Sequence, residues 1–333
     1  MVQHPALDKV VERIQTDVIG GAADTAKEVV EALARVAQDS SAKDATELAQ
    51  ELEAGVDRIL AVLPSLAPPV NALHMILGQV EELLKESVSV SEMAQGVIEE
   101  VQAFQARAEE ALQRVAQFGA EKIKDGDTIF TYSMSSTVWR VLRVAKAQGK
   151  SIRVIVTESR PANEGLWTVE EMAKIGVPVA VSIDACIGLL VPGCPIVMVG
   201  ADAVSSSGQV LCKVGTYPTA LVARAHGVPF YVAADTLKFD TTTLLGLPFR
   251  IDPLHREQVL PEEPKYGQAE VVGLHFDITP PALVTAVITE IGLVHPTACF
   301  SVMRQMKLSE RLAKKLPAWA KGEWAASGER AEA

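Results

Sequence analysis

From residue 127 onward the sequence alternates short apolar runs with amphipathic segments, and this alternation constrains the fold more than any other feature. The apolar runs are rich in β-branched residues and cover 128–133, 152–158, 177–184, 195–204 and 228–235. The segments STVWRVLRVAKAQG, GLWTVEEMAKIG and TYPTALVARAHG lie among them, are 12 to 14 residues long and each end on glycine. Because strands joined by crossover helices lie parallel, the pattern predicts an α/β fold with a parallel sheet covered on both faces.

The first part of the chain has a helical period instead. Apolar residues recur at three- and four-residue spacing in 22–38, 43–63 and 68–86, with charges on the other faces. Residues 89–123 are typical of one long helix, which Asp125 and Gly126 would end. A chain of 333 residues is long enough for two domains. We therefore expect a helical domain over residues 1–124 and a sheet-containing domain over residues 125–333.

Polar side chains gather at the ends of the predicted strands. The runs are almost wholly apolar until their last one or two residues, which include Ser133, Glu158, Asp184, Asp202 and Asp235. The carboxyl ends of parallel strands line one crevice, and ligands of such sheets bind there. Each of these residues could instead cap the helix that follows it. The five together favour a ligand site.

Several groups could hold a phosphate at this crevice. The segment SMSSTVWR brings hydroxyls and backbone N–H groups to a predicted helix N-terminus, which favours an anion. Arg160 can bind a phosphate with two hydrogen bonds, unless it pairs with Glu158 or Glu164. Lys213 offers a point charge next to bare backbone, unless it is a solvated hairpin lysine. The candidate phosphate ligands are thus Ser135, Ser136, Arg160, Lys213, Gly215, Thr216 and Lys238.

Composition and motifs argue against several other classes of protein. A net charge of −11 and only 5% aromatic residues leave neither a basic stripe nor a stacking platform for nucleic acid. No GxGxxG follows the first strand, no GxxxxGK[ST] is present and no two histidines have metal-pair spacing, so we expect no cofactor and no metal. No apolar run approaches the roughly 20 residues of a membrane span, and the N-terminus lacks the apolar core of a signal peptide. The four cysteines lack CxxC spacing and are expected to be reduced core residues of a cytoplasmic protein: Cys186, Cys194, Cys212 and Cys299.

Segments spread over the second domain resemble one protein family. They are VTESRPANEG (156–165), SIDACIG (182–188), VGADAV (199–204), KVGTYPTALVARAHGVPFYVAADTLKFD (213–240) and FDITPPALVTAVITEIGLVHPTA (276–298). The family contains the alpha, beta and delta subunits of translation initiation factor two B, ribose-1,5-bisphosphate isomerase and methylthioribose-1-phosphate isomerase. The resemblance implies a helical N-terminal domain, a Rossmann-like C-terminal domain and a homodimer built through the latter. The apolar run PPALVTAVITEIGLV (280–294) agrees with such a dimer.

The resemblance also implies roles for particular residues. The isomerases of the family use a Cys at the end of the first strand and an Asp in the GAD segment, and the matching positions are Ser133 and Asp202. Asp202 follows an apolar run, so we expect burial to raise the pKa of its carboxyl group. An N-terminal Arg-Gly-Ala segment of the family aligns with Gly20, Gly21 and Ala22, which makes Gly21 and Ala22 further candidates for phosphate binding.

Three positions depart from the family pattern. The Cys is Ser133, the Arg of the Arg-Gly-Ala segment is Gly20, and the Asn that commonly precedes the lysine is Cys212. A serine hydroxyl is a far poorer acid or base than a thiol, whose ordinary pKa is about 8.5. The departures weaken the catalytic interpretation while a sugar-phosphate pocket is still expected.

Two functions therefore remain open, both with a small phosphorylated sugar as partner. The first is an isomerase that converts an aldose 1-phosphate, ribose 1,5-bisphosphate or a related pentose phosphate, to the ketose phosphate by moving protons through Asp202 and Ser133. The residues Glu158, Asp184 and Lys238 would support these two. The second is a non-catalytic sugar-phosphate-binding protein, or a regulatory subunit like those of translation initiation factor two B.

Overall fold

The computed structural model describes residues 3–16, 21–64, 66–251, 253–260 and 266–320. Packing divides the chain into two compact units. A helical unit contains residues 1–109 together with 239–250 and 301–333, and a sheet unit contains residues 110–238 and 251–300. This division differs from a single boundary at residue 124, because two later segments return to the helical unit.

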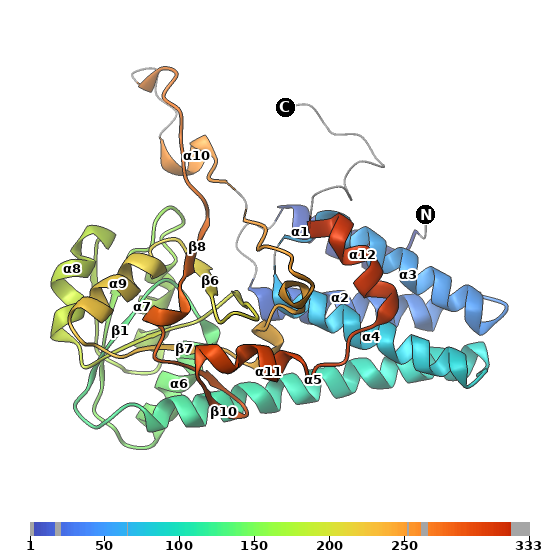
Figure 1. Cartoon of the computed structure of the whole chain (residues 1–333), viewed down its shortest axis with the longest axis horizontal. Helices are drawn as coiled ribbons and strands as arrows, with labels where there is room; N and C mark the ends of the chain where they lie inside the picture. The colour runs from blue at the N-terminus through green and yellow to red at the C-terminus, as the bar shows by residue number, and fades with distance from the viewer. Residues whose placement is uncertain (1–2, 17–20, 65, 252, 261–265, 321–333) are drawn as a thin grey trace. The chain divides into compact units, whose positions relative to one another are not determined.

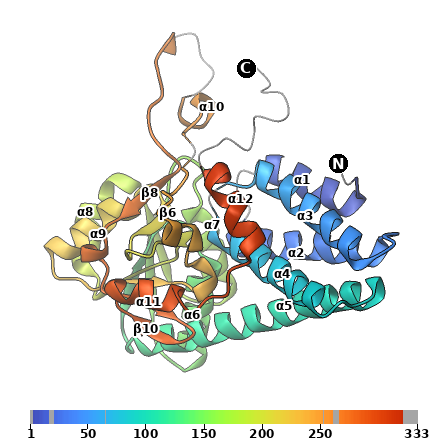
Figure 2. The ribbon, with the colours of Figure 1, turned by 45° about the vertical axis from the view of Figure 1, so that its right-hand side comes forward.

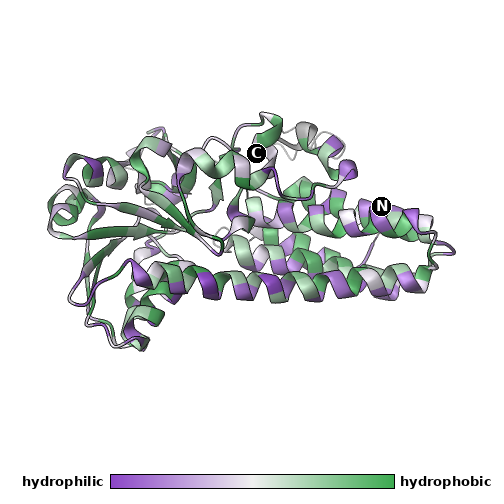
Figure 3. Ribbon diagram, turned by 60° about the horizontal axis from the view of Figure 1, so that its bottom comes forward, coloured by the Kyte–Doolittle hydropathy of each residue, from purple (hydrophilic) through white to green (hydrophobic). Residues whose placement is uncertain are grey.

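The helical unit has the helices that the periodicity predicts. Their bounds are α1 Pro5–Thr16, α2 Ala22–Asp39, α3 Ala45–Val62, α4 Ala67–Lys85 and α5 Val90–Glu121. The helix α5 passes from this unit into the sheet unit, and hydrophilic positions recur along its length (Figure 3). Asp44 begins α3 by accepting a hydrogen bond from the backbone N–H of Glu47 at 2.9 Å, as an N-cap does. Among the described helices, none is both long and apolar enough to cross a membrane.

Buried polar contacts attach the two later segments to the helical unit. Asn71 on α4 donates from Nδ2 to the carbonyl of Phe239 at 2.8 Å and accepts from the hydroxyl of Thr241 at 2.8 Å, next to the short helix η4 Thr241–Leu245. The last helix, α12 Glu310–Ala320, is preceded by Ser309, whose hydroxyl donates to Glu81 on α4 at 2.6 Å. These contacts explain why residues far apart in sequence form one unit.

The sheet unit contains the predicted parallel sheet (Figure 1). Its strands are β1 Thr128–Thr131, β2 Arg153–Thr157, β3 Val179–Ser182, β4 Ile196–Val199, β7 Phe230–Ala233, β9 Ala286–Thr289 and β10 Gly292–Val294, in the order β10-β9-β7-β4-β1-β2-β3. All neighbours are parallel except β10 and β9. The crossover helices are α6 Ser136–Ala147, α7 Gly165–Lys174, α8 Ile187–Leu190 and α9 Thr216–Ala225.

Both faces of the sheet are buried. On one face Ile129, Val154 and Met198 join a core cluster with Val115 of α5 and Val141 of α6. The alternate positions, such as Phe130, Val197 and Val232, are buried as well. A sheet covered on both faces was the expectation from the apolar runs, and it is confirmed.

The sequence did not predict a second, smaller sheet. It has the antiparallel order β5-β6-β8, with β5 Ala203–Val204, β6 Val210–Lys213 and β8 Phe276–Thr279. The run 195–204 was read as one strand, but β4 ends at Val199 and β5 belongs to the other sheet. The short strands VLCK and FDIT mix polar with apolar residues, so no period marks them. The apolar run 280–294 forms the short helix η6 Pro281–Leu283 and the strands β9 and β10, and β9 is buried in its own sheet.

The remaining short elements connect these layers. They are η1 Asp184–Cys186, η2 Val191–Gly193, η3 Thr236–Lys238, α10 Arg256–Val259, η7 Pro296–Ala298 and α11 Cys299–Met303. The stretch that carries α10 and leads into β8 extends away from the sheet, as Figures 1 and 2 both show.

A buried histidine lies where α12 meets α4. The Nδ1 atom of His74 accepts a hydrogen bond from the backbone N–H of Ser309 at 3.1 Å. Its Nε2 atom has no hydrogen-bond partner among the described residues. Burial lowers the pKa of His74 to about 4, although the charge of Glu81 opposes this shift. The folded protein therefore holds a neutral histidine at this contact.

This histidine predicts an acid-dependent loss of stability. Below pH 6.5 the unfolded chain binds a proton at His74 that the folded chain does not bind until about pH 4. The contribution of this group falls through that window, by about 3 kcal/mol at pH 4. We expect urea unfolding to show a smaller loss between neutral pH and pH 4 for His74→Gln than for the wild type. The exposed His226→Gln is the matched control, and equal losses in all three proteins would contradict the prediction.

Candidate active site

The candidate site lies where the strand order of the parallel sheet reverses. From β1 the chain adds β2 and β3 on one side and then returns to place β4 on the other side of β1. Crevices at such switch points are the usual ligand sites of parallel sheets. Ser133 follows β1 and Asp202 follows β4, so the two residues flank this crevice. Glu158 and Asp184 follow β2 and β3 at the same edge, as the sequence predicted.

Ser133 is held rigidly in an unusual backbone conformation. Its φ is 61°, a left-handed conformation that costs a non-glycine residue about 1 kcal/mol or more. Its N–H donates to the hydroxyl of Ser159 at 2.8 Å, and its carbonyl accepts from the hydroxyl of Thr168 at 2.8 Å. The residue is 3% exposed. These bonds fix the direction of the Ser133 hydroxyl.

That hydroxyl belongs to a buried array of three side chains. The Ser133 hydroxyl donates to Oε2 of Glu164 in a short hydrogen bond. The other carboxylate oxygen, Oε1, lies 2.8 Å from Nζ of Lys213. The Lys213 ammonium also lies 5.0 Å from the ring centroid of Phe276. Lys213 is therefore neither a solvated lysine nor an unpaired charge.

Glu164 is not among the site residues predicted from the sequence, where it was expected only as a possible partner of Arg160. One local sequence feature could have indicated the position of Glu164, namely Gly165, the first residue of α7. A Cβ atom at this position would collide with the carbonyl oxygen of Thr157, and the N–H of Gly165 donates to the carbonyl of Glu158 at 3.1 Å. Only glycine lets the loop return so close to β2, and this return places Glu164 over the end of β1.

Asp202 presents a carboxyl group of a different kind. The side chain keeps part of its surface accessible, and among the described residues its carboxylate has no hydrogen-bond partner. Burial raises the pKa of Asp202, with Lys238 and Lys213 opposing the rise and Glu164 adding to it. The expected direction of this shift is confirmed. The Asp202 carboxyl group thus has a raised pKa and lies within reach of the charges of two lysines.

The loop after β2 is fixed by Asp184. Its carboxylate accepts hydrogen bonds from the backbone N–H groups of Ser159 at 2.9 Å and Arg160 at 2.8 Å. The side chain of Arg160 is exposed, and no carboxylate of the described residues pairs with its guanidinium. The alternative pairing with Glu158 or Glu164 is therefore not what the structure has. Arg160 remains a candidate for an anionic ligand.

The two helix N-termini that were predicted to bind phosphate differ in which of their groups remain available to a ligand. At α6 the Ser135 hydroxyl accepts from the N–H of Val138 at 3.3 Å, while Ser136 is exposed. At α9, the carboxylate of Asp277 accepts from the N–H groups of Gly215 at 2.7 Å and Tyr217 at 3.0 Å. The Thr216 hydroxyl donates to the carbonyl of Lys213 at 2.7 Å. A phosphate bound by Gly215 and Thr216 would have to compete with the Asp277 carboxylate for these backbone N–H groups. The sequence did not predict this role of Asp277.

Lys238 is electrostatically coupled to two aspartates of the site, Asp202 and Asp235. Lys238, in η3, lowers the pKa of both Asp202 and Asp235 through its charge. Asp235 is 4% exposed, and burial raises the pKa of its carboxyl group to about 6. Its Oδ1 atom has no hydrogen-bond partner in the described part of the chain. Asp235 is thus a buried group, whereas the residue Asp202 is half-buried.

The remaining candidates, Gly21 and Ala22, begin α2 of the helical unit. Gly21 is the N-cap residue, with its carbonyl accepting from the N–H of Thr25 at 3.0 Å, and Ala22 is buried. Gly20 lies outside the described residues. A phosphate-binding role for Gly21 and Ala22 remains a prediction.

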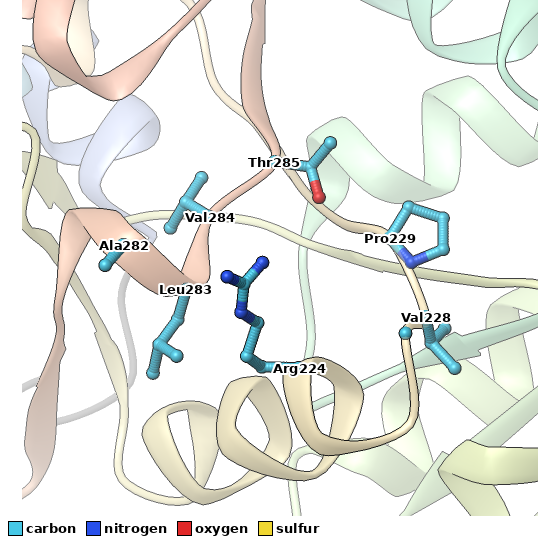
Figure 4. A pocket seen from close by; sticks show the side chains of 8 residues that line it. Arg224, Val228, Pro229, Ala282, Leu283, Val284 and Thr285 are labelled. Carbon is cyan, nitrogen blue, oxygen red and sulfur yellow. The ribbon is translucent and has the colours of Figure 1, made fainter.

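A cavity of about 250 Å³ lies elsewhere in the sheet unit. It is lined by Arg224, Val228, Pro229, Leu283, Val284 and Thr285, among others (Figure 4). Pro229 and Thr285 directly precede β7 and β9. The cavity is therefore at the amino ends of the parallel strands, opposite the edge that carries Asp202, and it takes no part in the candidate site.

The buried ion pair predicts an asymmetric response to substitution. Lys213→Met leaves the buried Glu164 carboxylate without a positive charge to pair with, and we expect a loss of about 3–5 kcal/mol in the free energy of unfolding. Adding Glu164→Gln should recover most of that loss, since no uncompensated charge then remains. The exposed pair of Lys174 with Glu171 gives the matched control, and Lys174→Met should cost at most about 0.5 kcal/mol. Urea denaturation measures all three, and a Lys213→Met loss as small as the control would contradict the prediction.

Comparisons with known proteins agree with this architecture. A model of the initiation factor 2 subunit family matches residues 18–296. Ribose 1,5-bisphosphate isomerase from Pyrococcus furiosus is 32% identical over 302 residues, which cover 89% of this chain and 93% of that protein. The protein of the same name from Haloferax volcanii is 33% identical over 305 residues, covering 91% and 93%.

Solved structures show the same fold. The crystal structure of the translation initiation factor eIF-2B of Pyrococcus horikoshii has a TM-score of 0.73 at 32% identity and covers 88% of this chain and 98% of that one. The 5-methylthioribose 1-phosphate isomerase of Pyrococcus horikoshii has a TM-score of 0.72 at 24% identity, covering 90% and 87%. The second likeness concerns the fold alone.

Proposed function

Because this chain belongs to the initiation factor 2 subunit family, we propose that it is a sugar-phosphate isomerase acting on ribose 1,5-bisphosphate or a related aldose 1-phosphate. The observation that carries the proposal is the Asp202 carboxyl group, which has a raised pKa, feels the charges of Lys213 and Glu164, and follows β4 at the switch point of the sheet, next to the strand that precedes Ser133. Two relatives that share about a third of their residues with this chain are ribose 1,5-bisphosphate isomerases, which supports this choice of substrate.

The proposed reaction needs groups that hold and release protons. An aldose phosphorylated on its anomeric oxygen opens only when the ring oxygen gains a proton as its bond to C1 breaks. A hydrogen then moves from C2 to C1, and the C2 hydroxyl loses its proton to give the ketone. A carboxyl group whose pKa is raised by burial gives and takes a proton more readily near neutral pH than an ordinary carboxylate does. Burial shifts the pKa of Asp202 in this direction.

The alternative is a protein that binds a sugar phosphate without converting it, as a regulatory subunit would. Two observations favour this alternative. Ser133 replaces the thiol that the family resemblance implies, and a solved structure at 32% identity is that of a translation initiation factor. The charges of Lys213 and Lys238 would serve binding equally well in either function.

Asp202→Asn separates the two functions. An amide keeps the shape of the carboxylate but cannot carry a proton, so we expect ketose formation from ribose 1,5-bisphosphate to fall about 10²–10⁴-fold. Binding, measured as the rise in melting temperature with saturating ligand, should change little. The exposed Asp39→Asn is the control. Unchanged turnover would exclude the role of Asp202.

The wild-type protein decides between the proposal and its alternative. A thermal shift without turnover, over a panel of aldose and ketose phosphates, would select the binding protein. Neither shift nor turnover would contradict both functions.

We also propose that the protein is a homodimer formed through the sheet unit. Exposed apolar side chains at the edge strand β3 and on α8 support this, namely Val181, Ile183 and Leu189. A stable dimer would bury about 2,000 Å² or more. Light scattering at micromolar concentration should give about twice the chain mass of 35.6 kDa, and a stable monomer would contradict the proposal.

The proposed chemistry exchanges protons only, so the proposal includes no cofactor. We further propose a cytoplasmic location, which the four free cysteines support, since reduced thiols are typical of that compartment. The proposed partner is the phosphorylated sugar itself.

A further inference from the structure

We infer that Glu164 is the proton acceptor behind Ser133, so that a hydroxyl and a carboxylate together do what a serine could not do alone. The inference rests on the proposed isomerase function and deepens it. A lone serine hydroxyl is too weak an acid to lose its proton and act as a base near neutral pH. In this site the hydroxyl already donates its hydrogen to Oε2 of Glu164.

The surroundings of Glu164 orient its carboxylate toward the hydroxyl of Ser133. The residue is 7% exposed, its Oε1 atom is paired with the Lys213 ammonium at 2.8 Å, and Oε2 is directed to Ser133. Such a nucleophile–base pair with a third orienting group is the arrangement that activates hydroxyls in enzymes. The ion pair with Lys213 orients Glu164, and the backbone bonds of Ser133 orient the hydroxyl.

The two carboxyl groups then divide the reaction. In its protonated form Asp202 gives its proton to the ring oxygen as the C1–O bond breaks, takes the C2 hydrogen as a proton and returns it to C1. The electron pair of the C2–H bond forms the C1–C2 double bond and later the new C1–H bond.

The relay handles the remaining proton. The C2 hydroxyl proton passes to Oγ of Ser133 while the hydroxyl proton of Ser133 passes to Glu164, and the electron pair left on oxygen completes the ketone. The reaction ends with Asp202 ionised and Glu164 protonated, and one proton returned from Glu164 to Asp202 restores the start. The two groups are close enough that the charge of Glu164 acts on the pKa of Asp202.

A double-substitution cycle tests whether the two residues act as one unit. We expect Ser133→Ala, Glu164→Gln and the double variant each to lower kcat by the same factor, about 10²-fold or more, because the relay is lost once. The exposed Glu170→Gln on α7 is the matched control and should keep wild-type turnover. Wild-type turnover in Glu164→Gln, or losses that multiply in the double variant, would overturn the inference.

A second measurement does not depend on turnover. In Ser133→Cys the introduced thiol replaces the hydroxyl that contacts Glu164, which is paired with Lys213. Asp202 and Lys238 are the other charged groups of the site, since Asp202 feels the charges of Glu164, Lys213 and Lys238. Adding Glu164→Gln removes a negative charge and leaves Lys213 unpaired, so the pKa of the thiol should fall by about one unit or more. Alkylation of that thiol with iodoacetamide, followed by peptide mass spectrometry across a pH series, measures the pKa in both variants.

The two measurements distinguish the inference from the function on which it rests. A lower thiol pKa in Ser133→Cys with Glu164→Gln than in Ser133→Cys alone supports the contact between position 133 and the Glu164 charge. If no sugar phosphate is converted in that case, the proposed function fails alone. An equal thiol pKa in the two variants overturns the inference whatever the turnover. Because both variants carry the same introduced thiol, accessibility affects them equally.

Discussion

The buried pairing of Glu164 with Lys213 is the interaction on which the rest of the site depends. It joins the loop before α7 to the strand β6, and through the hydroxyl of Ser133 it also reaches the end of β1. Removing two charges from water is costly, and the pair compensates this cost only when both partners are present and hydrogen-bonded. Such a pair contributes specificity of arrangement more than stability. The pair thereby connects the smaller antiparallel sheet to the main parallel sheet at the crevice.

The order of the strands decides which side chains can meet. Because β1 and β4 are neighbours although residues 132–195 separate them, Ser133 and Asp202 flank one crevice. Asp184 and Asp277 act differently from Asp202, since both accept backbone N–H groups and shape the loops around the site. Only some carboxylates of this edge therefore keep a free oxygen for chemistry.

The sequence predicts the parts of the structure that depend on local period. The apolar runs with a polar last residue indicated β1, β2, β3, β4 and β7, and with them the positions of Ser133 and Asp202. The role of Glu164 could not be predicted from the sequence, because its partner Ser133 is 31 residues away and its partner Lys213 is farther still. No rule of sequence spacing connects a loop glutamate with either residue. The strands β6 and β8 escaped for a related reason, since their four residues mix polar and apolar types. The features that the sequence did not predict are therefore tertiary contacts between segments far apart in the chain.

The cap that Asp277 places on α9 has a consequence for how this chain can vary in evolution. Asp277 lies 62 residues after Gly215, and the chain between them includes the stretch around α10 that extends away from the sheet. The entropy of closing a loop rises only slowly with its length, by about 0.6 kcal/mol for each doubling. Insertions or deletions in this outlying stretch should therefore be tolerated as long as β8 still pairs with β6. Homologous chains are expected to differ most in length here, while the spacing from Asp277 through β8 stays constant.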